Sequence, residues 1–212
     1  MFRRHGIAVS ANALQRVEPA IKFAIDAATE VESISDADRG GRYFDGILDS
    51  AGVPRSPSRT AALSEIYAYH MEHNLWEHVA ADVRPALERL RGLGAKLAVV
   101  SNANGVLQRV LDRVGLSRFF DAVCDSFVEG VEKPDPRLFA LALNRTHSRA
   151  ETTLHVGDLF HVDVVGARRA GLRAVLIDPH GLYGSFDVDR VRDLAELAGR
   201  VGVATTGKPS RD

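Results

Sequence analysis

After Ala80 the sequence alternates between short apolar runs and longer stretches in which apolar residues recur at helical spacing. The short runs are rich in Val, Leu and Ile, which is typical of buried strands. Strands that alternate with helices in this way form βαβ units, with parallel strands and with helices on the faces of the sheet. The second part of the chain is therefore predicted to be an α/β domain. Four strands are expected, at 97–101, 122–125, 154–157 and 174–177.

Helices are expected to follow the first three of these strands. The first helix should end at Gly115, because glycine is common in the left-handed position that terminates helices. The second should begin at Asp135, a residue that caps helices, followed by Pro136 in the first turn. The third is expected over 164–170.

The part of the chain before about Trp76 shows helical periodicity alone. One helix is expected behind the N-cap Ser10, a second across 43–51, and a third behind Ser58. No apolar run typical of a strand occurs there. We therefore expect an all-helical domain over 1–78, an α/β core over 79–204 and a flexible tail over 205–212.

The composition excludes several classes of protein. The 212 residues are 45% hydrophobic and 26% charged, with a formal net charge of −1, so a broad nucleic-acid surface is disfavoured. No run approaches the ~18 apolar residues that a membrane helix needs, and the first twenty residues lack the pattern of a secretory leader. Cys124 is the single cysteine, which excludes an internal disulfide. We expect a cytoplasmic protein that binds a small ligand, and neither nucleic acid nor a membrane.

Polar residues end the first expected strand. Ligands of open α/β sheets bind outside the carboxyl ends of the strands, and this strand ends in Ser101-Asn102. A hydroxyl at a strand end, followed by a small-residue turn and the free amides of a helix, suits a phosphate group. Taken alone, Ser101 or Asn104 is explained as well by helix capping.

A lysine and two carboxylates follow the next two strands. Lys133 precedes Pro134 in a stiff turn, where its ammonium suits an anion or an ion pair, although an isolated loop lysine is usually solvated. Asp158 ends the third strand and Asp163 follows it by five residues. Such a pair supplies the hard oxygen ligands that Mg²⁺ prefers, although Asp163 is also explained by its place near a helix start. His155 and His161 are interpreted as a strand residue and a loop residue, without a zinc site.

Together these residues resemble a known family. Ser101-Asn102, Lys133-Pro134-Asp135-Pro136 and Gly157-Asp158 with Asp163, followed by Gly166 and Gly171, are similar in order and spacing to motifs two to four of the haloacid dehalogenase (HAD) superfamily. The match extends over about 80–178, and the helical first part is similar in position to that superfamily's cap domain. The resemblance implies a Rossmann-like core with a parallel sheet, helices on both faces and an all-helical cap.

The resemblance also implies an activity and a set of roles. The chain would be a Mg²⁺-dependent phosphomonoester phosphatase that acts on a small phosphorylated metabolite through an aspartyl-phosphate. Ser101 would hydrogen-bond the transferring phosphoryl group with support from Asn102, and Lys133 would neutralise charge on the nucleophile and the phosphate. Asp158 would bind Mg²⁺, and Asp163 would ligate the metal or orient its shell. Such a site is physically reasonable, since phosphoryl transfer depends mainly on positioning and charge stabilisation.

The first motif of the superfamily is an apolar strand that ends in the nucleophilic Asp, usually followed two residues later by a second Asp that serves as general acid and base. This motif has no counterpart in the sequence. Residues 1–6 contain no apolar strand and no carboxylate. Asp45 lies between Tyr43 and Ile47, on a stretch with helical spacing, and is rejected as the nucleophile. The resemblance places the missing strand between the first and third expected strands, so two pairs of strands with unpaired edges are expected.

Two expectations follow from this gap. The natural protein is expected to carry about 15 to 30 further residues upstream, enough for one strand and its connection. The 212-residue form is expected to be inactive as a phosphatase, because without the nucleophile no aspartyl-phosphate forms.

Other functions stay open at this point. One is a catalytically silent binding or regulatory protein whose sheet is completed by another chain. Another is carbon–halogen cleavage, which is disfavoured because two carboxylates beside an anionic substrate require a cation between them. Lys22 is the single lysine of the helical part, and no pattern assigns it a role. The sequence indicates neither the substrate nor the oligomeric state.

Overall fold

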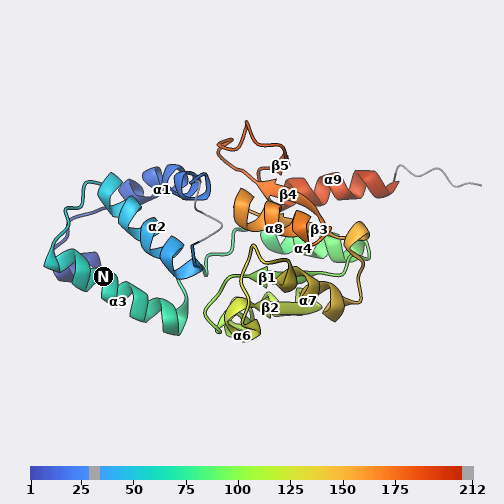
Figure 1. Ribbon diagram of the computed structural model, residues 1–212, viewed down its shortest axis with the longest axis horizontal. Coiled ribbons are helices and arrows are strands. Elements are labelled where there is room, and N and C mark those ends of the chain that lie inside the picture. Colours follow the sequence, from blue (N-terminus) through green and yellow to red (C-terminus); the bar gives the residue numbers. More distant parts are fainter. Residues whose placement is uncertain (29–33, 207–212) are drawn as a thin grey trace, which may run out of the picture.

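The computed structural model describes residues 1–28 and 34–206 of the chain. Its first part is all-helical, as predicted, and consists of η1 (Phe2–His5), α1 (Ala11–Asp26), α2 (Asp36–Ser50) and α3 (Pro57–His73). Figure 1 shows α1, α2 and α3 gathered at one end of the molecule, away from the strands. The strands and the other helices make up the second part, which begins after the segment that contains Trp76.

Short polar side chains start the helices of the first part. The hydroxyl of Ser10 accepts a hydrogen bond from the Ala13 amide, which confirms the predicted N-cap of α1. The prediction for α3 was wrong by two residues, because Ser56 and not Ser58 is its N-cap. Pro57 then occupies the first turn, where its missing N–H costs no helical hydrogen bond.

In the described part of the chain, five parallel strands form two separate sheets. In the first, β1 (Ala98–Ser101) pairs with β2 (Ala122–Asp125). In the second, β4 (Arg173–Ile177) lies between β3 (Leu154–Gly157) and β5 (Asp189–Val191). The four predicted strands are confirmed with nearly the same bounds. The sequence did not predict β5, because its three residues, Asp-Arg-Val, form no apolar run.

The predicted gap in the sheet is present between β1 and β3. Across the described ranges, 1–28 and 34–206, no strand pairs with the free edge of either one. All four residues of β3 are partly exposed, and so are the last three residues of β1. Central strands of a parallel sheet are normally buried on both faces. The two sheets therefore leave open the place that a central strand would fill.

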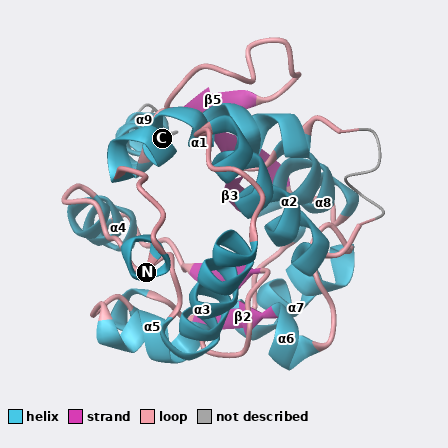
Figure 2. Cartoon of the chain, turned by 90° about the vertical axis from the view of Figure 1, so that its left-hand side faces the viewer, coloured by secondary structure: helices cyan, strands magenta, loops and turns pink. Residues whose placement is uncertain are grey.

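Helices hold the two sheets together from both faces. On one face, Phe139 of α7 (Pro136–Thr146) packs with Ala167 of α8 (Val165–Arg169), and both Val100 of β1 and Ala174 of β4 contact this cluster. On the other face, α4 (Val83–Gly92) packs against α9 (Leu194–Thr206) through Leu90 and Ala198. Figure 2 shows α4 and α9 on one side of the strands and α7 and α8 on the other.

Shorter elements complete the second part. They are α5 (Leu107–Arg113), η2 (Ser117–Phe119), α6 (Ser126–Glu129), η3 (Ala150–Thr152) and the π-helical turn η4 (Phe160–Val164). Gly115 follows α5 with φ 68°, which confirms its predicted left-handed position. The predicted tail at 205–212 was wrong for its first two residues, because α9 continues through Thr206. Residues 207–212 lie outside the described part of the chain.

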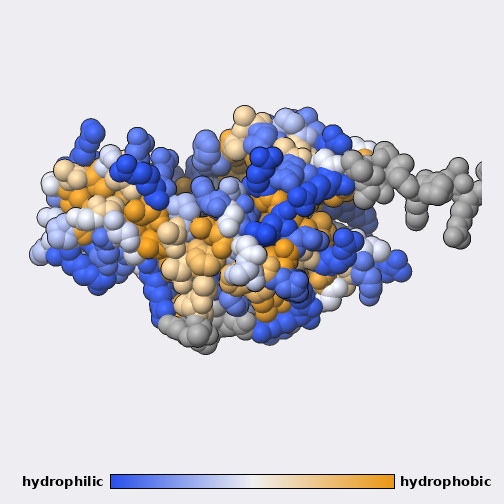
Figure 3. Space-filling view, turned by 90° about the horizontal axis from the view of Figure 1, so that it is seen from above, coloured by the Kyte–Doolittle hydropathy of each residue, from blue (hydrophilic) through white to orange (hydrophobic). Residues whose placement is uncertain are grey.

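The surface seen from above is mainly hydrophilic, with smaller groups of hydrophobic residues between the polar ones (Figure 3). Among the helices of the described ranges, none combines the length and the apolar character that crossing a membrane requires.

Candidate active site

A buried ion pair joins the loop after α6 to η4. The ammonium of Lys133 lies 2.7 Å from Oδ1 of Asp163. The side chains are 11% and 3% exposed, respectively. Both residues were predicted to belong to one site, and the structure brings them into direct contact although 30 residues separate them in sequence. In a low-dielectric interior, such a pair fixes the positions of both charges.

Asp163 is hydrogen-bonded on both carboxylate oxygens. Oδ1 contacts Nε2 of His155 at 3.1 Å in addition to Lys133, and Oδ2 accepts the backbone amides of Asp158 and Leu159 at 3.1 and 3.0 Å. Burial by itself raises the pKa of the Asp163 carboxyl, but Lys133 and His155 more than offset it and hold the pKa well below its usual range. Asp163 is therefore ionised at neutral pH.

Gly157 allows this close approach. A Cβ atom at Gly157 would overlap the carboxyl carbon and Cβ of Asp163. The end of β3 can thus lie directly on the Asp163 side chain because residue 157 has no side chain of its own. His155, interpreted as a strand residue, does lie in β3, but no sequence pattern indicates its contact with Asp163.

Asn102 links the end of β1 to Lys133. Its Oδ1 accepts the Lys133 amide at 2.7 Å, and its Nδ2 donates to the Lys133 carbonyl at 3.0 Å. The same Nδ2 lies 3.3 Å from Oδ1 of Asp36, at the start of α2. The side-chain amide of Asn102 is therefore engaged with the backbone of Lys133 and with Asp36, so it fixes the position of Lys133.

Ser101 is the last residue of β1 and is partly exposed. Its hydroxyl donates to the carbonyl of Asn102 at 3.3 Å. Within the described ranges, no direct hydrogen bond joins it to Lys133, Asp158 or Asp163. Ser101 thus lies beside the network formed by the other predicted residues and reaches it through its neighbour Asn102.

The amides after Ser101 have partners that the sequence did not reveal. Asp125, the last residue of β2, accepts hydrogen bonds from the amides of Gly105 and Leu107 through its carboxylate. The Ala103 amide donates to the hydroxyl of Ser126. Three amides of the expected phosphate cradle are therefore already engaged, and the cradle itself stays a prediction. The carboxylate at the end of the neighbouring strand already satisfies the start of the helix.

Asp158 lies at the exposed side of the network. Its side chain is 56% exposed, and its Oδ2 lies 2.5 Å from the ammonium of Lys22 in α1. This contact brings the helical first part of the chain onto the candidate site. Sequence reasoning missed it, because the two residues are 136 positions apart and Lys22 stands in no recognisable motif.

A second contact anchors α1 beside the site. Asp26, at the end of α1, is 1% exposed and accepts the backbone amides of Phe160 and His161 at 2.5 and 3.0 Å. Burial raises the pKa of the Asp26 carboxyl, and the two amide hydrogen bonds oppose that shift. The anchored segment, η4, is the same segment that carries Asp163.

The two predicted metal ligands differ in how far their oxygens are engaged. Asp163 already has partners on both oxygens, whereas Asp158 is largely exposed and contacts Lys22. The described part of the chain contains no group of three His, Cys, Asp or Glu side chains arranged to hold a metal ion. Mg²⁺ needs only one or two protein carboxylates when water and phosphate oxygens complete its shell. Asp158, oriented through the contact of its amide with Asp163, fits that requirement.

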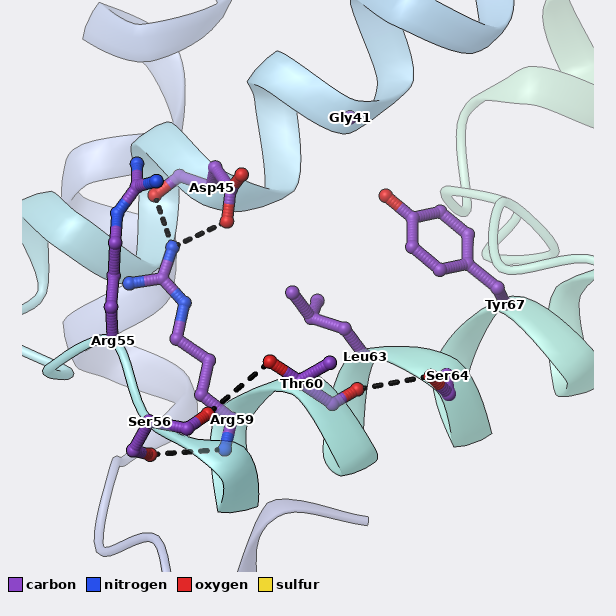
Figure 4. Close-up of a pocket in the computed structure, with 9 residues that line it drawn as sticks. All are labelled: Gly41, Asp45, Arg55, Ser56, Arg59, Thr60, Leu63, Ser64 and Tyr67. Atoms are coloured by element: carbon purple, nitrogen blue, oxygen red, sulfur yellow. Dashed lines mark hydrogen bonds and ion pairs between the residues drawn. The ribbon is translucent and has the colours of Figure 1, made fainter.

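The helical part contains a pocket of its own, of about 350 Å³, between α2 and α3 (Figure 4). Arg59 lies in its wall, with Nη2 2.6 Å from Oδ1 of Asp45. Asp45 thus lies in α2 and forms an ion pair with Arg59, which agrees with rejecting it as a strand-end nucleophile.

Comparison with known proteins identifies the family. Residues 7–171 match the haloacid dehalogenase-like hydrolases. The chain is 34% identical over 168 residues to glyceraldehyde 3-phosphate phosphatase from Methanopyrus kandleri, a match that covers 74% of this chain and 71% of that protein. It is 37% identical over 141 residues to ribulose-1,5-bisphosphate 5-phosphatase from Halopiger xanaduensis, covering 65% of this chain and 57% of that protein.

The similarity extends to the fold of a solved structure. The Bacillus subtilis protein YfnB, solved bound to magnesium, superposes with a TM-score of 0.67 over 95% of this chain and 87% of its own, at 22% identity. The chain spans between about half and seven tenths of the length of the curated relatives it matches. The fold is Rossmann-like with a helical cap, and the chain belongs to the haloacid dehalogenase-like hydrolases, among which it is phosphatase-like.

Proposed function

We propose that the protein is a Mg²⁺-dependent phosphomonoester phosphatase of the cytoplasm that acts through an aspartyl-phosphate. The observation that carries this proposal is the continuous set of contacts from Asn102 through Lys133 and Asp163 to the backbone of Asp158. It joins the carboxyl ends of β1 and β3, where α/β proteins bind their ligands. One ammonium, one exposed carboxylate and one buried carboxylate suit a dianionic phosphate together with a divalent cation.

Each residue has a role in this proposal. The hydroxyl of Ser101 would donate to an oxygen of the transferring phosphoryl group, and the ammonium of Lys133 would offset the charge on that group. Asn102 would act as a positioning residue, because its amide engages both backbone groups of Lys133. Asp158 would hold Mg²⁺, and Asp163 would orient Asp158 through its amide. The bound cation would supply charge neutralisation at the phosphate oxygens.

The nucleophile would come from a strand between β1 and β3. Support comes from the separation of the two sheets and from the partly exposed residues of β1 and β3. An apolar strand there would pair with both free edges, and an Asp at its carboxyl end would lie beside Ser101, Lys133 and Asp158. That carboxylate would attack phosphorus and release the alcohol, and water would then hydrolyse the acyl phosphate to inorganic phosphate.

The proposed substrate is a small phosphorylated metabolite. Two relatives are named as phosphatases of glyceraldehyde 3-phosphate and ribulose 1,5-bisphosphate, which are both phosphorylated sugars. In this proposal residues 1–78 act as a cap over a core formed by 79–204. The contact of Lys22 in α1 with Asp158 supports that division, because it brings the helical part to the mouth of the site.

The test compares two forms of the protein. One is the 212-residue chain, and the other carries an N-terminal extension made of an apolar strand that ends in Asp-x-Asp. We expect Mg²⁺-dependent release of phosphate from p-nitrophenyl phosphate by the extended form, and none by the shorter form. A matched extension ending in Asn-x-Asp should also be inactive, because it restores the strand without the nucleophile.

Variants of the extended form separate the proposed roles. Lys133→Met and Asp158→Asn should each lower kcat by at least about a hundredfold, the effect expected for losing one charge-stabilising group. Equal activity of the 212-residue and extended forms would contradict the proposed mechanism. Activity that survives Asp158→Asn at full rate would contradict the metal site.

A further inference from the structure

Lys22 occupies a position that the proposed chemistry leaves without a role. It lies in α1, and its ammonium is 2.5 Å from Oδ2 of Asp158. The two side chains are 28% and 56% exposed, whereas Lys133 and Asp163 are almost completely buried. The positive charge of Lys22 therefore lies at the open side of the site, across Asp158 from the buried pair.

The helix that carries Lys22 is held in place by other contacts. Asp26 accepts the amides of Phe160 and His161, and the ring of Phe23 packs edge-on against the ring of Tyr183 at 5.0 Å. These contacts lie within one or two turns of Lys22 on α1. The ammonium would therefore stay at the mouth of the site if its ion pair with Asp158 were broken.

A divalent cation on Asp158 would break that ion pair. The ammonium and the cation compete for one carboxylate, and an exposed ion pair of this kind contributes little by itself. The cation carries twice the charge and would displace the ammonium. Lys133 would remain with Asp163, because that pair is buried and well away from solvent. Cation binding thus leaves Lys22 as a positive charge without its carboxylate.

Glu18 and Tyr43 lie near Lys22 within the helical part. Glu18 lies one turn before Lys22 on α1, and its Oε1 accepts a hydrogen bond from the hydroxyl of Tyr43 at 3.1 Å. Burial and the neighbouring Glu18 raise the pKa of Tyr43, so its hydroxyl stays protonated. Glu18 is thereby directed to Tyr43 of α2, whereas Lys22 is directed to Asp158 of the core.

We propose that Lys22 binds a second anionic group, a carboxylate or a phosphate, on the leaving group of the substrate. This inference rests on the proposed phosphatase function and narrows its substrate class to phosphomonoesters that carry another anionic group. The reason is charge balance. Lys133 and the cation offset the charge of the transferring phosphate. A further anion on the cap side would replace Asp158 as the partner of Lys22.

Equilibrium binding to the 212-residue chain tests the inference without any catalytic step. The probes are phosphonoacetate, which carries a phosphonate and a carboxylate, and methylphosphonate, which lacks the carboxylate. In the presence of Mg²⁺, titration calorimetry should show about tenfold tighter binding of phosphonoacetate, the effect of one hydrogen bond to a charged group. Lys22→Met should abolish this preference, and Lys22→Arg should keep most of it.

A matched control and a second measurement complete the test. Lys96 donates to the Thr146 carbonyl and makes no contact with the site residues, so Lys96→Met should bind both probes as the unaltered chain does. Mg²⁺ titrated alone should bind Lys22→Met more tightly than the unaltered chain, because the competing ammonium is gone.

The possible failures are distinguishable. If both probes bind but Lys22→Met keeps the preference for phosphonoacetate, Lys22 does not bind a second anion and the inference is wrong. An unchanged Mg²⁺ affinity in Lys22→Met would contradict the displacement step. If neither probe binds the unaltered chain with Mg²⁺ present, the inference is contradicted, whereas the proposed function is decided separately by the phosphatase activity of the extended form.

Discussion

The ammonium of Lys133 lies 2.7 Å from Oδ1 of Asp163, in a position where both side chains are almost fully withdrawn from solvent. Two strand ends meet at this pair, since Asn102 of the segment after β1 holds the Lys133 backbone and the amide of Asp158 after β3 donates to Asp163. The pair therefore couples the stability of the fold to the geometry of the candidate site.

We expect Lys133→Met to lower the free energy of unfolding by about 3–5 kcal/mol, because it leaves the Asp163 carboxylate buried without its counter-charge. Lys22→Met is the matched control, since Lys22 also contacts a site aspartate but in a more exposed pair. Its effect should stay below about 1 kcal/mol. Urea denaturation followed by circular dichroism measures both, and similar losses in the two variants would contradict the distinction.

The Lys133–Asp163 pair should also give stability a dependence on pH. The pKa of Asp163 in the folded state is below its usual range, so the carboxyl stabilises the fold above its unfolded pKa of about 3.9 and loses that contribution as the pH falls toward the folded pKa. The difference in unfolding free energy between the unaltered protein and Asp163→Asn should therefore have its largest value at pH 7. It should shrink as the pH falls below about 4. A constant difference across this range, measured by urea titrations at several pH values, would show that Asp163 has no lowered pKa.

Gly157→Ala should destabilise the protein by about 1–3 kcal/mol, the usual cost of forcing extra volume into a packed site. The added Cβ would overlap the Asp163 carboxyl, which would have to move away from Lys133. Gly40→Ala provides the comparison, because Gly40 lies within α2 and a Cβ there meets no atom within 4 Å. That change should be neutral or stabilising by up to about 1 kcal/mol. Thermal unfolding of both variants tests the prediction, and a stable Gly157→Ala would refute the claimed contact.

Arg59→Met should destabilise the helical part. Arg59 is 2% exposed, and its guanidinium donates to the carbonyls of Val53 and Asp45 and to the carboxylates of Asp45 and Asp49. Figure 4 shows the contacts with Asp45. Leaving buried acceptors without a donor costs about 1–3 kcal/mol. Arg55→Met removes another arginine that contacts Asp49, but Arg55 is well exposed. The midpoint of urea unfolding of this variant should therefore equal that of the unaltered protein. Equal shifts in the two variants would contradict the role assigned to Arg59.

The strands illustrate what sequence patterns predict well. The four predicted strands were found because each is a run of apolar residues between helical segments with clear start or stop residues, such as Gly115 and the Asp135-Pro136 pair. β5 escaped prediction because it is three residues long and largely polar, and only its pairing with β4 makes it a strand. The gap beside β1 was predicted from the absence of one motif and is present in the sheet topology.

The candidate site was predicted only in part. Lys133, Asp158 and Asp163 were expected together because the carboxyl ends of parallel strands converge. The partner of two amides after Ser101 could not be predicted, because Asp125, a residue of another strand, accepts their hydrogen bonds. The contact of His155 with Asp163 could not be predicted, because a histidine in a strand gives no indication of which side chain it faces.

The sequence by itself determined the order of the elements and the chemistry at the strand ends, because apolar periodicity, capping residues and short motifs are local properties of the chain. Only the tertiary structure decided which groups meet. It placed Lys22 of α1 on Asp158 and the carboxylate of Asp26 on the amides of η4, and it left β1 and β3 apart. These relationships depend on how helices and sheets pack between segments that lie far apart in the sequence, and no local pattern encodes that packing.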